Sequence, residues 1–296
     1  MPSPSSAKEY WSAPSYVAKD PINILFSGEM LDLFSPSVIR FHRVVALHGE
    51  VGTEATVKLD EELAAKLTPG ERYIVLFSPY KKQRTPPKGY VKNRDGPMVV
   101  SREGLAPAVF LDSEASRAVM GVHDNAVTAG QLMDIMGGAD FNLAESAAME
   151  LVMGSVGIKG MSDREYERFE SLARTGPPKV RLIALFGMSK FGRRPDMLKI
   201  ANETLADVNC AITASYSELI RFLIDEAEPD FDRSSLDMLL GWARCPQAVV
   251  YERALTLVKT LDAEAWQDEL ILQSRTTFLD EAKRENLNRM LNKSGE

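Results

Sequence analysis

Alternation of apolar and polar residues marks the first third of the chain as β-rich. In residues 38–47 (VIRFHRVVAL), Ile39, Phe41, Arg43 and Val45 share one face, which is the period-two pattern of a half-buried strand. Residues 72–77 (RYIVLF) are the most apolar run and are predicted to form the central strand. Short strands at this spacing are typical of a barrel or a sandwich. Further strands are predicted over 22–33, 54–59, 98–100 and 108–111.

Two local features refine this β pattern. Gly28 lies inside the first predicted strand, and an interior glycine indicates a bend or a bulge. Residues 61–67 lack the strand pattern and are predicted to be short helical or irregular structure before the central strand.

From Ser113 onward the periodicity becomes helical. Two capping boxes, Ser162–Glu165 and Ser215–Glu218, each predict the start of a helix, and Pro177-Pro178 separates two helices. Helix starts near 179, 214 and 247 recur at about 33–35 residues, a period typical of stacked helix pairs. Helices are predicted over 163–174, 179–190, 195–206, 214–227, 233–243, 247–261 and 264–291.

Three segments of the β-rich part carry a family resemblance. Residues 44–52 (VVALHGEVG), 55–59 (ATVKL) and 67–77 (LTPGERYIVLF) resemble the netrin-like OB barrel shared with tissue inhibitors of metalloproteinases. The resemblance implies an OB-type barrel. Those inhibitors chelate zinc through an N-terminal cysteine, whereas the first cysteine here is Cys210, so that mechanism does not carry over. The helical part resembles HEAT repeats in its period.

The patterns together predict an α+β fold with four parts. A small OB-like β-barrel precedes an all-helical bundle or a short helical-repeat domain. The expected divisions are a flexible N-terminal segment (1–20), the barrel (21–112), a partly helical connector (113–161) and the helical domain (162–296).

Composition and charge exclude some classes of protein. Apolar residues make up 45% of the 296 residues and charged residues 26%, the balance of a globular chain. No apolar run approaches the roughly 20 residues that span a bilayer. The net charge is −7, but residues 1–110 hold 14 Lys+Arg against 12 Asp+Glu and the remainder holds 21 against 30. An acidic chain disfavours non-specific nucleic-acid binding, although a local basic patch can still matter.

The cysteines and the N-terminus bear on the compartment. Cys210 and Cys245 are expected to be two buried thiols, and the alternative is a disulfide closing a loop of about 35 residues. Ser5, Ser6 and Ala7 are residue types common just after a signal-peptide cleavage site. The sequence therefore favours a periplasmic or secreted protein given without its signal peptide, and the alternative is a cytoplasmic one.

The sequence offers no catalytic constellation. His42 and His48 would share a face of an unbroken strand, but no metal-ligand motif accompanies them. Ser113 has no G-x-S-x-G context to join it to His123. Residues 154–160 (GSVGIKG) lack the spacing of a phosphate-binding loop and are predicted to be a flexible connector. We expect no cofactor, no metal and no enzymatic activity, while a hydrolase using only Asp and Glu remains an open alternative.

The most informative surface is the segment 80–94 (YKKQRTPPKGYVKNR), a predicted long loop after the central strand. Six lysines and arginines are interleaved in it with two tyrosines, a composition that suits binding to a polyanion or an acidic protein. The predicted partner-binding residues are Tyr80, Lys81, Lys82, Arg84, Lys88, Tyr90, Lys92 and Arg94.

These features predict a non-enzymatic protein-binding protein of the inhibitor or immunity type. It would recognise another protein through the barrel loops and the helical surface. The alternative is a single-stranded nucleic-acid-binding OB-fold protein that uses the basic loop 80–94.

Overall fold

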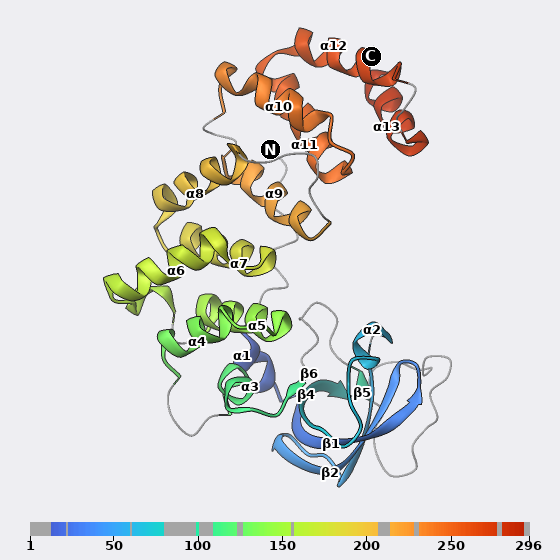
Figure 1. The fold of residues 1–296 in the computed structure, drawn as a ribbon, viewed down its shortest axis with the longest axis vertical. Coiled ribbons are helices and arrows are strands. Elements are labelled where there is room, and N and C mark those ends of the chain that lie inside the picture. The colour runs from blue at the N-terminus through green and yellow to red at the C-terminus, as the bar shows by residue number, and fades with distance from the viewer. Residues whose placement is uncertain are drawn as a thin grey trace. The chain divides into compact units, whose positions relative to one another are not determined.

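The computed structural model describes residues 13–21, 23–59, 61–79, 99–100, 109–122, 127–154, 157–206, 214–227, 231–276 and 280–292. The chain forms two compact units, unit 1 (Met1–Leu172) and unit 2 (Ala173–Glu296). The boundary falls inside helix α6 (Asp163–Thr175). All described strands belong to unit 1, and unit 2 is built from helices (Figure 1). The chain is therefore an α+β protein, as the sequence predicts.

The described strands of unit 1 make one sheet in the order β1-β2-β3-β5-β4-β6, in which β4 also pairs with β1. The β3–β5 pair is parallel, and every other pair is antiparallel. Strand β4 pairs with β1, β5 and β6, which confirms that it is central. The strands are β1 (Ile24–Ser35), β2 (Val38–His48), β3 (Glu54–Lys58), β4 (Arg72–Pro79), β5 (Val99–Val100) and β6 (Val109–Leu111).

One face of the sheet encloses an aromatic core. Phe26 contacts Phe41 and Phe77 edge-to-face, with ring centroids 5.4 and 5.5 Å apart, and all three rings are buried. On the opposite face Leu25 and Ile74 are also fully buried. A central strand that is covered on both faces has a continuous run of apolar residues instead of an alternating pattern. Strand β4 is strongly apolar for this reason.

The β1–β2 pair is irregular. The register shifts between Ser27 and Glu29, so Gly28 lies in a bulge, as the sequence predicts. A Cβ at Gly28 would approach the Phe26 ring to 3.0 Å. The predicted alternation of β2 holds at Ile39 and Phe41 but fails at Val45, which is 54% exposed. Arg43 has φ 50° and turns the strand between these positions, which interrupts the period of two.

The second part of unit 1 is helical. Its N-caps include Thr128, which forms a capping box with Gln131, and Asp140, which accepts from two backbone amides. Ser162 and Glu165 form the predicted capping box of α6. The described helices of unit 1 are α1 (Pro14–Ala18), α2 (Glu61–Ala64), which lies between β3 and β4, α3 (Glu114–Val119), α4 (Ala129–Met136), α5 (Phe141–Met153), the 3-10 turn η1 (Ile158–Gly160) and the start of α6.

Unit 2 continues with helices that pack mainly on their neighbours in sequence, among them α7 on α8, α10 on α11 and α12 on α13. The predicted single helix over 264–291 is wrong, because two helices stand there. Asp280 accepts from the Ala282 amide and so starts the second of them. The elements are α7 (Pro178–Lys190), α8 (Arg194–Ala206), α9 (Ala214–Ala227), the 3-10 turn η3 (Arg233–Ser235), α10 (Leu236–Ala243), α11 (Ala248–Leu261), α12 (Ala263–Ser274) and α13 (Glu281–Asn292).

Two further observations bear on the sequence predictions. Cys245 is buried and disulfide-bonded, so it is not the free thiol that the sequence reading favoured. The other cysteine, Cys210, lies outside the described residues. In the part of the chain that the structure describes, every helix is too short or too polar to cross a bilayer.

Candidate functional site

The predicted basic loop lies outside the described residues, and so do all eight of its proposed binding residues. The structure does place the strands on either side of it. Strand β4 ends at Pro79 and β5 begins at Val99, and these two residues are register partners in an antiparallel pair. The two described residues that flank the segment 80–98 therefore lie side by side in the sheet.

The two described histidines, His42 and His48, join no cluster of metal ligands among the described residues. His42 Nε2 lies 3.2 Å from Glu29 Oε1, and Arg43 bonds the other oxygen of Glu29 at 3.1 Å. Burial acts to raise the pKa of Glu29, but the contacts with His42 and Arg43 outweigh it and hold the pKa below its usual value. Among the described residues no group of three potential ligands comes together. His123 lies outside them.

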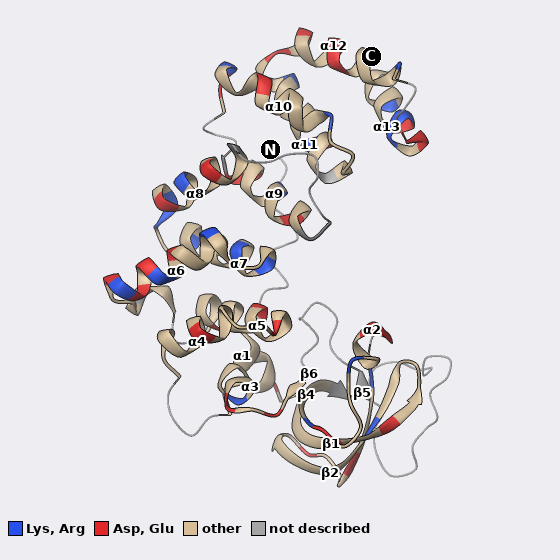
Figure 2. Cartoon of the chain, viewed as in Figure 1, with Lys and Arg blue, Asp and Glu red and all other residues tan. Residues whose placement is uncertain are grey.

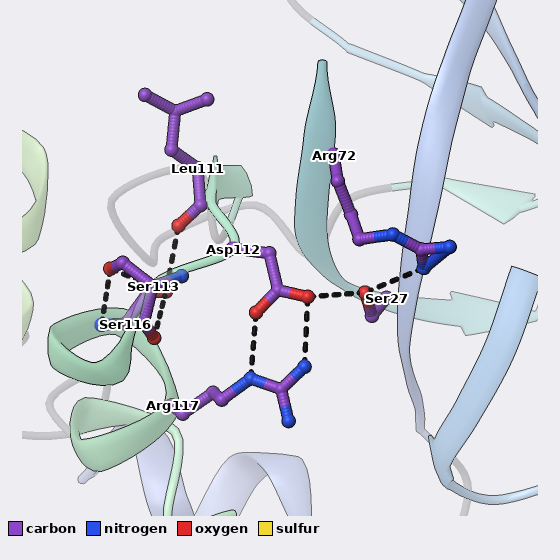
Figure 3. A network of polar contacts seen from close by, with 7 residues as sticks. All are labelled: Ser27, Arg72, Leu111, Asp112, Ser113, Ser116 and Arg117. Atoms are coloured by element: carbon purple, nitrogen blue, oxygen red, sulfur yellow. Dashed lines mark hydrogen bonds and ion pairs between the residues drawn. The ribbon is translucent and has the colours of Figure 1, made fainter. Parts of the chain in front are cut away.

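A buried polar network joins the sheet of unit 1 to helix α3 (Figure 3). We call Ser27, Arg72, Asp112 and Arg117 the Asp112 network. Arg117 donates to both oxygens of Asp112, from Nε at 2.7 Å and from Nη2 at 2.9 Å. Ser27 donates from Oγ to the same carboxylate, and Arg72 donates from Nη1 to Ser27 Oγ at 3.1 Å. The four residues come from β1, β4, the turn after β6 and α3.

The Asp112 network is fully matched in donors and acceptors around its carboxylate. The Asp112 side chain is only 7% exposed, and the bidentate hydrogen bonds from Arg117 hold its pKa below the usual value despite burial. Beside it Ser113 caps α3, because its Oγ accepts from the Ser116 amide at 3.1 Å. Ser113 is thus engaged in capping, and we assign this network to fastening α3 onto the sheet.

A second buried carboxylate holds the N-terminal helix of unit 1. Glu150 on α5 accepts from Ser15 N at 3.0 Å and from Ser15 Oγ at 2.7 Å, across 135 residues of sequence. Gly121, with φ +70°, allows this approach, since a Cβ there would come within 2.7 Å of the Ser15 Cβ. Burial raises the pKa of Glu150, and the bonds from Ser15 oppose the shift only in part.

Unit 2 buries a lysine among α10, α11 and α13. Lys283 Nζ donates to the carbonyls of Cys245 at 2.6 Å and Ala243 at 3.3 Å, which lie at the C-terminal end of α10. It also lies 4.4 Å from the centre of the Tyr251 ring. Burial lowers the pKa of Lys283 to about 8, and the charge of Glu269 opposes that shift.

Glu269 links this lysine to a second cation. Arg244 donates to both its oxygens, from Nε and Nη2 at 2.8 Å each, and Gln273 donates to Oε1 at 2.6 Å. Burial acts to raise the pKa of Glu269, but these bonds outweigh it and the pKa is lowered. Gln273 Oε1 is buried and accepts no hydrogen bond from the described part of the chain.

A pocket of about 710 Å³ opens beside the lysine, and we call it the Lys283 pocket. One wall is the chain from Arg244 to Glu252 and the other is α13, which carries charges of both signs (Figure 2). Its polar lining residues are Arg244, Tyr251, Glu252, Asp280, Lys283, Asn286 and Arg289. The pocket has the size and mixed lining of a small-molecule site.

The sequence carried a signal for this site that the reading of the residues missed. Glu269 and Gln273 fall at helical spacing with Trp266 and Leu270, on the buried stripe of α12. Lys283 likewise lies four residues before the buried Leu287. Polar residues on the apolar stripe of a helix are expected to be buried, and buried polar groups need hydrogen-bond partners. They are therefore candidates for a polar site inside the fold. The sequence could not show that Lys283 on α13 lies near the carboxylate of Glu269 on α12.

Comparison of the chain with protein-family models, with curated proteins and with solved structures gives no match.

Proposed function

We propose that the chain is a non-enzymatic binding protein of the inhibitor or immunity type, which recognises another protein through loops of an OB-like barrel. The helical surface of unit 2 provides a second binding surface in this proposal. The observation that carries it is the Pro79–Val99 pairing, which sets the basic segment 80–98 as the connection between β4 and β5. In OB folds this connection is one of the two loops that bind ligands.

The order of strand pairing supports the OB-like part of the proposal. Pairs run from β1 through β2, β3, β5 and β4 and return to β1, and the parallel β3–β5 pair completes that circuit. Helix α2 stands between β3 and β4. A small barrel would have such a ring of pairings, and β6 adds a further strand beside β4. The netrin-like resemblance belongs to this proposal. So does the HEAT-like arrangement of unit 2, which is supported by helices that pack on their neighbours in sequence.

The chemistry of the loop defines the partner sought. Lys81, Lys82, Arg84 and Lys88 form a cationic cluster within eight residues, with Tyr80 beside it. A protein with an acidic surface matches that cluster, and such complementarity raises the rate of association and the specificity. Tyrosine is among the residues that dominate binding energy at interfaces.

The test compares two sets of charge reversals. One variant changes Lys81, Lys82, Arg84 and Lys88 together to Glu. The matched control changes four exposed cations of the described residues, which have no ion pair there, by the same total charge: Lys66, Lys199, Arg221 and Arg275. The wild type and the control should capture the same protein in quantitative affinity purification, and the loop variant should lose it by at least about tenfold. Equal capture by all three proteins would remove the loop from the proposal.

A second candidate function shares the loop. The segment between β4 and β5 contains Tyr80 and Tyr90 among its cations, and this composition also suits binding to single-stranded nucleic acid. The cations would contact phosphates and the tyrosine rings would stack on bases. Fluorescence anisotropy with a labelled oligothymidylate separates the two functions. Affinity that falls steeply between about 50 and 200 mM salt supports nucleic-acid binding, because phosphate contacts release counterions. Absence of binding at about 50 mM salt ends this alternative.

A further inference from the structure

The Lys283 pocket lies in unit 2 and is independent of the β4–β5 connection, which belongs to unit 1. Its volume of about 710 Å³ lies within the range of roughly 300–1,000 Å³ typical of small-molecule sites. Both walls belong to unit 2, and most of the lining residues lie on helices α11 and α13. Sites built on helices hold their side chains in more defined positions than sites on loops.

Hydrogen-bond donors on the lining exceed the acceptors available to them. Arg289 has no hydrogen-bond or ion-pair partner among the described residues, so its guanidinium is free to bind a ligand. Arg244 uses Nε and Nη2 on Glu269, which leaves Nη1. Lys283 uses two of its three protons on backbone carbonyls.

Each of the two carboxylates on the lining accepts a hydrogen bond from the chain itself. Glu252 accepts from the Asn286 amide, and Asp280 accepts from the Ala282 backbone amide at the start of α13. The three lining cations face these two carboxylates and also Glu269, which Arg244 binds outside the lining, so the charges balance. Arg289 is the lining cation with no hydrogen bond or ion pair among the described residues, which suits a single negative charge, whereas the two lining carboxylates would repel a phosphate dianion.

We propose that the Lys283 pocket binds a small organic carboxylate, with the free guanidinium of Arg289 as its principal contact and Arg244 and Lys283 beside it. A planar guanidinium fork matches a carboxylate in bidentate geometry. Tyr251 and the apolar Pro246 and Ala248 line the same pocket and give the organic part of the ligand a surface to contact.

The experiment uses the full chain and three acids, acetate, hexanoate and 3-phenylpropionate, each paired with its uncharged amide. Binding is measured by calorimetry and by chemical-shift changes at the Asn286 side-chain amide. We expect at least one acid to bind saturably while its amide does not. Arg289→Gln should raise the Kd at least about tenfold, because it removes a charge-assisted hydrogen bond. Arg275→Gln, an exposed arginine outside the pocket, should leave the Kd unchanged.

Three results would overturn the proposal: no acid binding at up to about 20 mM, where even a weak ligand of this size is detected; amides that bind as well as their acids; or an unchanged Kd in Arg289→Gln. A carboxylate can also come from the end of a peptide. A hexapeptide with a free C-terminus that binds more tightly than 3-phenylpropionate, and more tightly than its amidated form, assigns the site to chain ends. Weaker binding of the peptide assigns it to free acids.

Discussion

Both units bury a carboxylate against an arginine, but the surroundings of the two pairs differ. In unit 1 Asp112 receives Arg117 and Ser27, and its oxygens are fully used. In unit 2 Glu269 likewise receives two hydrogen bonds from Arg244 and one from Gln273, but a pocket lies beside this network and is lined by Arg289, which has no hydrogen bond or ion pair among the described residues. A network whose charges are paired fastens elements together, whereas an unpaired arginine on a pocket wall leaves capacity for a ligand. The same residue types thus support structure in one unit and a candidate site in the other.

The largest effect is expected from removing the shared carboxylate of unit 2. Glu269→Ala leaves Lys283 buried without its counter-charge and removes the acceptor of both Arg244 hydrogen bonds and one of the two acceptors of Gln273, so the free energy of unfolding should fall by about 3 kcal/mol. Denaturation followed by fluorescence of the buried Trp242 and Trp266 measures this. The matched control is Asp225→Ala, which breaks a more exposed pair with Arg253. Asp225→Ala should lower the free energy of unfolding by no more than about 1 kcal/mol. Equal losses in the two variants would show that the Glu269 network stabilises unit 2 no more than an exposed ion pair does.

The pH dependence of unit 2 should show the buried lysine. The pKa of Lys283 is about 8 in the folded chain against 10.5 for an unperturbed lysine. Between these values the unfolded chain holds a proton that the folded chain has lost, so stability rises as the pH rises through this window. The gain should reach up to about 3 kcal/mol.

Lys283→Met is the reference for this measurement, because other groups titrate in the same range. The difference in unfolding free energy between pH 7.5 and pH 10.5 is compared for the wild type and the variant. The additional rise should be present only in the wild type. Identical pH profiles would show that the lysine is not desolvated in solution.

In unit 1 the Asp112 network should stabilise the packing of α3 on the sheet. Asp112→Ala removes the acceptor of both Arg117 and Ser27 and should cost about 2 kcal/mol. Hydrogen exchange of the α3 and β6 amides reports the loosening locally. Asp32→Ala, which breaks the exposed pair with Arg40 in the same sheet, is the control and should cost no more than about 1 kcal/mol. Unchanged exchange in Asp112→Ala would rule out the fastening role.

A smaller effect is expected at Glu150. Glu150→Ala removes both hydrogen bonds to Ser15 and should cost about 1–2 kcal/mol, with faster exchange of the α1 amides. Glu150→Gln keeps an acceptor and removes the buried charge, so it should cost less. Because burial raises the pKa of Glu150, the folded chain keeps a proton that the unfolded chain has released just above 4.5. Stability therefore falls as the pH rises through that window in the wild type, but not in Glu150→Gln.

The smallest effect on stability is expected at Arg289. Its guanidinium has no hydrogen bond or ion pair among the described residues, so Arg289→Gln should change the unfolding free energy by less than about 0.5 kcal/mol. Thermal denaturation checks this. A larger loss would mean that Arg289 serves the fold, and the contrast between the two units would then be weaker.

Local signals in the sequence determined most elements of the fold. The strands follow from short apolar runs, the bulge from Gly28, and the start of α6 from the Ser162–Glu165 capping box. These features depend on neighbours within a few residues, so they can be predicted from the sequence without a structure. The prediction of a single helix over 264–291 was wrong because the helical pattern of apolar residues continues on both sides of the break between α12 and α13. Asp280 caps the start of the second helix.

Only the tertiary structure decided which residues meet. Ser15 reaches Glu150 across 135 residues, and Lys283 reaches the end of α10 some 38 to 40 residues before it. Burial of a polar side chain can be inferred from its place on an apolar stripe, but its partner depends on how distant elements pack. The sequence therefore fixed the kinds of elements and the chemistry they carry, while long-range packing decided that one carboxylate fastens a helix and another stands beside a pocket.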